Sequence, residues 1–134
     1  MVSNGHNTGT LAFLGDAVYE LYVRRHVAES GLVHSDILHK MAVRYVSAEG
    51  QAKVIKVLMA GELTEDELTL VKRARNHKAS PSKKTKASKH GGDIITDKLA
   101  TAFEALLGEL YLSGDTGRLE EIVNRSFEII EQGD

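Results

Sequence analysis

The chain has 134 residues, 42% of them hydrophobic, which is enough for one domain with a buried core and too little for two ordinary domains. It contains no cysteine, which excludes disulfides, thiolate catalysis and zinc–thiolate sites. Because it also shows no signal-peptide pattern and no apolar run of about 20 residues, we expect a single soluble, cytoplasmic domain over residues 1–134, without membrane association.

The net charge of −2 conceals a strongly basic segment. No acidic residue lies between Glu67 and Asp93, and this window holds eight of the 17 Lys and Arg residues: Lys72, Arg73, Arg75, Lys78, Lys83, Lys84, Lys86 and Lys89. A local basic segment on an otherwise acidic chain indicates a polyanionic partner, usually nucleic acid. The alternative is a solvated loop whose lysines only maintain solubility.

The first half of the chain predicts helices. Residues from about 9 to 29 place Leu11, Leu14, Val18 and Leu21 on one face at helical spacing, with a cap among Asn7, Thr8 and Thr10. A second helical stretch opens at Ser35 and runs to about residue 61, and Gly50 is expected to divide it into two helices.

The second half continues this pattern. "GELTEDELTLVKRARN" predicts a helix capped by Thr64, with acids in its first turn and bases in its last, as the helix dipole favours. Residues from about 77 to 93 lack periodicity and predict a basic loop, and helices follow from about 95 to 113 and from 115 to 131. Since no alternating strand pattern occurs, we expect an all-α fold.

Two of these helices carry an acid and a glycine on an otherwise nearly uncharged surface. "LAFLGDAVYE" contains Gly15 and Asp16, and "LATAFEALLGELYL" contains Glu104 and Gly108. A glycine inside a helix costs about 1 kcal/mol relative to alanine. We therefore expect each glycine to permit the close approach of another helix or of a substrate.

The two acids together predict a cation site. An ionised carboxylate on a mostly apolar helix needs a partner, and contact between Asp16 and Glu104 is repulsive unless a cation lies between them. Two oxygen ligands in a chain without cysteine favour a hard ion such as Mg²⁺. The alternative is that both acids are solvated or paired with Arg or Lys.

"LAFLGDAVYELYVR" and "LATAFEALLGELYL" resemble the two signature helices of the ribonuclease III family. "LHKMAVRYVSAEGQA" and "KRARN" resemble its short form, which has the catalytic domain without the appended double-stranded-RNA-binding domain. The resemblance covers residues 9 to about 115. It implies an intertwined homodimer that uses Mg²⁺ to cleave double-stranded RNA to 5′-phosphate and 3′-hydroxyl ends, with a structured precursor of large-subunit ribosomal RNA as substrate.

The resemblance also implies roles for individual residues. Asp16 matches the family's aspartate and Glu104 its glutamate, so both are expected to be catalytic and to hold the metal. Ala12 and Thr101 stand where full-length members usually carry Glu and Asp. The short form also has fewer acids there, so we do not interpret this departure as lost activity, and we expect Thr101 to order a water near the metal.

RNA binding is expected to depend on the basic segment, through phosphates and 2′-hydroxyls. The candidates are Arg73, Arg75, Asn76, Lys78, Lys83, Lys84, Lys86 and Lys89. In the alternative interpretation, Arg73 and Arg75 pair with acids at the dimer interface.

Two other classes of function remain open from the sequence. The chain could be a non-catalytic RNA-binding or ribosome-associated helical dimer that lost its chemistry through Ala12 and Thr101, or a helical interaction module with an acidic pocket. The intact Asp16 and Glu104 favour the enzyme.

Overall fold

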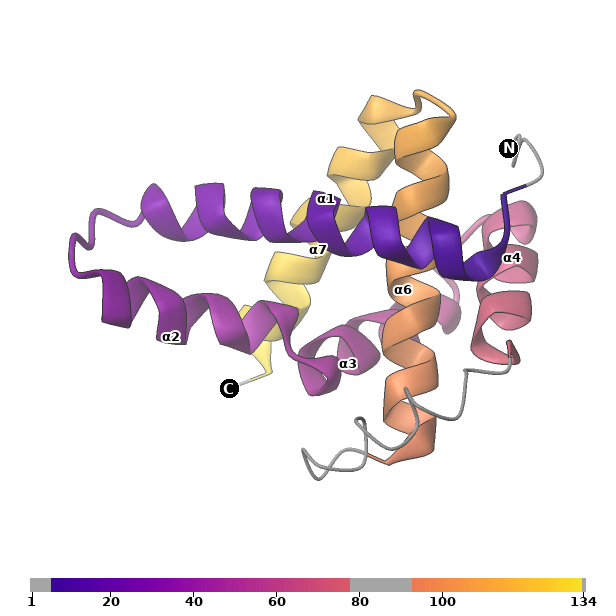
Figure 1. Cartoon of the computed structure of the whole chain (residues 1–134), viewed down its shortest axis with the longest axis horizontal. Coiled ribbons are helices and arrows are strands. Elements are labelled where there is room, and N and C mark those ends of the chain that lie inside the picture. The colour runs from indigo at the N-terminus through magenta and orange to yellow at the C-terminus, as the bar shows by residue number, and fades with distance from the viewer. Residues whose placement is uncertain (1–5, 78–92, 134) are drawn as a thin grey trace.

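The computed structural model describes residues 6–77 and 93–133, and every regular element within these ranges is an α-helix. In chain order these are α1 (Thr8–Ala28), α2 (Ser35–Val46), α3 (Ala48–Met59), α4 (Glu65–Arg75), α6 (Ile94–Leu112) and α7 (Thr116–Gln132) (Figure 1). The all-α expectation is confirmed. Nearly all of the expected basic loop lies outside the described residues. Within the described part, no helix is long and apolar enough to cross a bilayer.

Helix boundaries follow local hydrogen-bonding chemistry. Asn7 caps α1, because its side-chain oxygen accepts the backbone N–H of Thr10 at 2.8 Å. Thr64 caps α4 as expected and exchanges reciprocal hydrogen bonds with Glu67, in the arrangement known as a capping box. These caps satisfy backbone donors that the first helical turn leaves unpaired.

The division between α2 and α3 lies at Ser47, so the expectation that Gly50 separates them is wrong by three residues. Ser47 has extended backbone, and its hydroxyl accepts the N–H of Gly50 at 3.1 Å, which caps α3. A Cβ on Gly50 would lie 2.4 Å from the Arg44 carbonyl oxygen. Glycine is therefore needed because the first turn of α3 packs tightly against the last turn of α2.

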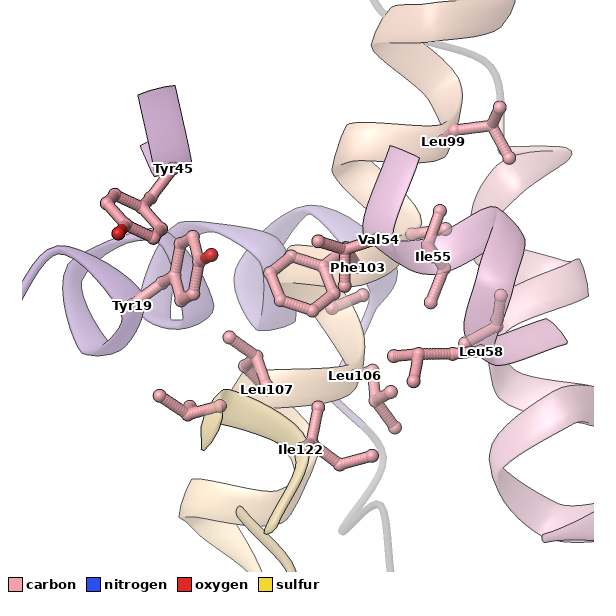
Figure 2. Close-up of a cluster of buried hydrophobic side chains, with 14 of the residues drawn as sticks. Tyr19, Tyr45, Val54, Ile55, Leu58, Leu99, Phe103, Leu106, Leu107 and Ile122 are labelled. Atoms are coloured by element: carbon pink, nitrogen blue, oxygen red, sulfur yellow. The ribbon is translucent and has the colours of Figure 1, made fainter. Parts of the chain in front are cut away.

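The core surrounds α6, which packs against α1, α3, α4 and α7. Leu99, Phe103, Leu106 and Leu110 follow one another at helical spacing along α6, and all four are buried. Figure 2 shows α6 side chains among those of α3 and α7, with the labelled residues Val54, Ile55, Leu58, Phe103, Leu106, Leu107 and Ile122. Because α6 is enclosed on most sides, any polar side chain on it has few directions in which to reach solvent.

The core-facing stripe of α1 differs in part from the expectation. Leu11 is buried together with Gly15, Tyr19 and Val23, residues spaced four apart. Leu21, in contrast, is 71% exposed. The amphipathic pattern of α1 contains two apolar stripes, and the described residues cover only one of them.

Polar contacts attach both ends of α7 to the rest of the domain. Near its start, Arg118 donates two hydrogen bonds of 2.8 Å to the buried carboxylate of Glu67 on α4. Near its end, Glu131 accepts a hydrogen bond of 2.8 Å from the hydroxyl of Tyr45 on α2 and contacts His26 on α1. The last helix is thus held against α1, α2 and α4.

Candidate active site

Helices α1 and α6 cross in direct backbone contact at two glycines, and Figure 1 shows α1 running across α6. A Cβ on Gly15 would lie 1.7 Å from the carbonyl oxygen of Glu104. A Cβ on Gly108 would lie 2.0 Å from the carbonyl oxygen of Leu11. The expectation that these glycines permit a close helix approach is confirmed, and the contact brings Asp16, the neighbour of Gly15, to Glu104.

The side chains of Asp16 and Glu104 form a carboxyl pair beside this crossing. Asp16 is exposed and Glu104 is partly buried. Burial raises the pKa of Glu104 to about 8, and the negative charge of Asp16 and a hydrogen bond with it act in the same direction. The part of the chain that the structure describes brings no Lys or Arg into an ion pair with either acid, so at neutral pH the pair retains a proton unless a cation neutralises it.

The donor set of this pair fits a hard divalent cation. It offers carboxylate oxygens only, and within residues 6–77 and 93–133 no group of three or more His, Asp or Glu side chains gathers around a common point. Mg²⁺ keeps several of its waters and commonly uses one or two protein carboxylates, so two acids suffice. Ala12, where full-length members usually have a third acid, is buried.

Thr101 lies one turn before Glu104 on α6 and is partly buried. Its hydroxyl donates a hydrogen bond of 3.0 Å to the carbonyl oxygen of Asp97 in the preceding turn. Because the single hydroxyl hydrogen is committed to the helix backbone, the Thr101 oxygen can only accept from a water near the acid pair.

Gln51 is a site residue that sequence reasoning missed. It is only 2% exposed, and its amide nitrogen donates to the carbonyl oxygen of Val46 at 3.1 Å. Its side chain also hydrogen-bonds Glu104, which acts to lower the pKa that burial raises. A signal existed, because Gln51 shares helical spacing with the apolar Ile55 and Leu58 and therefore belongs to the buried face of α3.

Glu109, one turn beyond Ala105 on α6, is a second buried acid to which the sequence assigned no role. It is fully buried, and among the described residues neither of its carboxyl oxygens has a hydrogen-bond partner. Burial raises the pKa of Glu109, against the opposing charge of His6. It is therefore a buried acid of the core rather than a third member of the Asp16–Glu104 pair.

The basic candidates lie partly within the described residues. Arg73 and Asn76, at the end of α4, line a hollow of about 540 Å³ together with residues from the start of α1. Neither Arg73 nor Arg75 takes part in the ion pairs of the described residues. The remaining candidates, Lys78, Lys83, Lys84, Lys86 and Lys89, lie outside the described residues.

The all-helical fold, with two acids at the crossing of α1 and α6, agrees with the family resemblance seen in the sequence. The chain belongs to the ribonuclease III family, whose members are double-strand-specific endoribonucleases, because the family's "Ribonuclease III domain" matches residues 9–115.

Curated relatives agree with this assignment. The chain is 51% identical over 125 residues to "Mini-ribonuclease 3" of Brevibacillus brevis, covering 93% of this chain and 88% of the relative. It is 42% identical to "Mini-ribonuclease 3" of Enterococcus faecalis, covering 85% and 83% of the two chains. The crystal structure of a Fusobacterium nucleatum protein superposes with a TM-score of 0.78 at 29% identity, covering 92% and 93%. The resemblance seen in the sequence is thus confirmed.

Proposed function

We propose that this endoribonuclease uses Mg²⁺ at Asp16 and Glu104 to hydrolyse double-stranded RNA, leaving 5′-phosphate and 3′-hydroxyl ends. The observation that carries the proposal is the carboxyl pair, which two helices hold together although its members repel each other when both are ionised. Its substrate would be the structured precursor of large-subunit ribosomal RNA, processed in the cytoplasm. Similarity to the Mini-ribonuclease 3 relatives over most of the chain supports this role.

Each site residue has a distinct part in this chemistry. Asp16 and Glu104 would hold the cation, and Glu104 would give up its proton as the cation binds. When bound, Mg²⁺ polarises a phosphodiester and makes a water more acidic. Thr101 would accept a hydrogen bond from a water beside the pair, which orients that water toward the phosphate.

RNA would be held by the end of α4 and by the basic segment that follows it. Arg73 and Asn76 line a shared hollow, and Arg75 lies between them in the sequence, partly buried. Such side chains contact phosphates and 2′-hydroxyls without reading base sequence. Lys78, Lys83, Lys84, Lys86 and Lys89 would add attraction that depends on salt concentration.

A homodimer would cover the apolar surface that one chain leaves exposed. Most of the exposed large apolar side chains of the described residues lie on α1, α2 and the turn between them: Phe13, Leu21, Leu32, Val33, Ile37 and Val43. Monomeric proteins rarely expose such surface contiguously. A two-fold dimer would also supply two carboxyl pairs, one for each strand of a duplex.

The test compares the wild type with Asp16→Asn and Glu104→Gln on a long RNA duplex, with and without Mg²⁺. We expect cleavage by the wild type only with Mg²⁺, and each variant to be folded, to bind RNA and to cleave at least about a hundredfold more slowly. That loss corresponds to about 2.7 kcal/mol of transition-state stabilisation. Glu128→Gln, which alters an exposed acid of α7, serves as the control and should cleave normally.

Two outcomes would contradict the proposal. Near-normal cleavage by Asp16→Asn or Glu104→Gln would remove these residues from the site. A wild type that binds the duplex but never cleaves it would instead support the non-catalytic RNA-binding alternative.

A further inference from the structure

Gln51 occupies a position where its amide group is held in one orientation. The residue lies in the first turn of α3, which approaches the end of α2 closely because Gly50 has no side chain. The Gln51 nitrogen donates to the Val46 carbonyl oxygen at 3.1 Å. Turning the amide over would place its own oxygen against that carbonyl, and two acceptors do not bond. The nitrogen therefore has a defined place, with a second N–H still to donate.

The second partner of this amide is Glu104. Across the contact between α3 and α6, Gln51 acts on Glu104 as a hydrogen-bonding side chain and lowers the pKa of that acid. Gln51 thus links the backbone at the end of α2 to a carboxyl group that also faces Asp16. It touches Glu104 from α3, whereas Asp16 approaches from α1.

The other end of the amide shows that stability alone does not account for glutamine here. The Gln51 side-chain oxygen is buried and has no hydrogen-bond partner among the described residues. Burying an unsatisfied acceptor is unfavourable, whereas an apolar side chain of the same length would have no unsatisfied acceptor. The amide nitrogen is the atom that makes glutamine useful at this position.

We propose that Gln51 is a positioning residue that holds the carboxylate of Glu104 in the orientation needed to bind the divalent cation. The inference rests on the proposed function, since it assigns Gln51 a role at the same metal site. The N–H of Gln51 opposes the repulsion between Asp16 and Glu104, which would otherwise turn the Glu104 side chain away once both acids are ionised. Partners of this kind alter metal affinity without touching the metal.

The experiment measures binding of Mn²⁺ to the RNA-free protein, from the electron paramagnetic resonance signal of the free ion. Gln51→Met keeps the length of the side chain and removes both the N–H donor and the unsatisfied oxygen. We expect about tenfold weaker Mn²⁺ binding and a matching increase in the Mg²⁺ concentration for half-maximal cleavage. Thermal stability should fall slightly, because the carbonyl oxygen of Val46 loses its hydrogen bond.

Ser126→Ala provides the matched control. It removes a different buried hydrogen bond, that between the Ser126 and Tyr19 hydroxyls at 3.1 Å, which involves neither Asp16 nor Glu104. It should lower thermal stability and leave Mn²⁺ affinity unchanged. Gln51→Asn keeps the amide but is too short to reach both partners, so it should weaken Mn²⁺ binding as Gln51→Met does. If the methionine variant does not fold, the asparagine variant tests the role of Gln51 in its place.

The possible failures can be told apart. If the wild type binds no Mn²⁺, the proposed function itself fails. If the wild type binds Mn²⁺, Glu104→Gln does not, and the folded Gln51 variants bind as tightly as the wild type, the metal site stands and the role of Gln51 is overturned.

Discussion

Glu104 is the residue whose chemistry depends most on its neighbours. Three influences act on its pKa: its burial, the negative charge of Asp16, and hydrogen bonding by the Gln51 side chain. The first two influences favour the protonated acid and the third favours the carboxylate, with the net result that its pKa lies near 8. Binding of a cation to this acid must therefore displace a proton near neutral pH.

This pKa predicts how pH and Mg²⁺ act together on stability. Because the pKa of Glu104 is about 8 in the folded chain against 4.5 ordinarily, the folded state binds more protons between these values, so metal-free stability falls as pH rises through this window. A bound cation offsets that loss. We expect Mg²⁺ to raise the melting temperature more at pH 8 than at pH 5, in thermal melts followed by circular dichroism.

The control for this prediction is Glu104→Gln, which cannot ionise. In that variant the effect of Mg²⁺ on the melting temperature should be small and equal at both pH values. An equally large effect of Mg²⁺ at pH 5 and pH 8 in the wild type would contradict the assignment.

At the scale of the elements, the crossing of α1 and α6 determines the site. The separation of the two helices is set by backbone atoms, because neither Gly15 nor Gly108 has a side chain to hold them apart. A methyl group at either position cannot be accommodated by a rotamer change, since the atoms it would meet belong to the opposing backbone.

We therefore predict that Gly15→Ala costs about 3 kcal/mol or more of unfolding free energy and abolishes cleavage, because it forces the helices apart. Gly117→Ala is the matched control: a Cβ there meets nothing within 4 Å, and alanine favours the helix, so stability should stay equal or rise slightly. Urea denaturation and cleavage assays measure both effects. A Gly15→Ala protein as stable and active as the wild type would show that the crossing is looser than described.

The elements also show what the sequence could and could not predict. The helices, the cap at Thr64 and the glycine approach follow from local spacing and chemistry, and were predicted. Asn7 was one of three candidates for the cap of α1. The division at Ser47 was not, because the backbone packing that requires Gly50 becomes visible only once α2 and α3 are placed. The contact of Gln51 with Glu104 joins residues far apart in the chain, which no local pattern reveals.

At the scale of the whole molecule, the second apolar stripe of α1 is the main apolar feature that the part of the chain described by the structure leaves uncovered. Phe13 is 79% exposed and lies one turn before Asp16. Periodicity shows that such a stripe exists and does not show whether the same chain or another chain covers it. This is why the sequence groups Leu21 with Leu11 on one helix face, although only Leu11 is buried.

We predict that Phe13→Glu converts a dimer into a monomer, because a carboxylate on this stripe would have to be desolvated at the interface. Phe13→Leu, which stays apolar, should remain dimeric. Light scattering at micromolar concentration distinguishes the two states. If the wild type is itself a stable monomer under these conditions, the proposal of a site for each strand of a duplex fails.

The end of α4 gives a second prediction at this scale. If Arg73 neutralises a phosphate, Arg73→Ala should weaken duplex binding about equally for all sequences and reduce the slope of log affinity against log salt by about one. Arg125→Ala, which removes a cation held by Glu62, should leave the slope unchanged. Filter binding over a salt series measures this slope. An unchanged slope for Arg73→Ala would show that Arg73 does not neutralise a phosphate.

The backbone contact between α1 and α6 also governs how the enzyme fails on heating. Because each acid sits beside a glycine packed on the opposing main chain, the pair cannot separate through the fraying of one helix end or the opening of a surface turn. It separates only when the two most central helices part, which is the cooperative unfolding of the whole domain. Heat should therefore leave no population of folded but inactive molecules, and residual cleavage should follow the fraction of chains still folded.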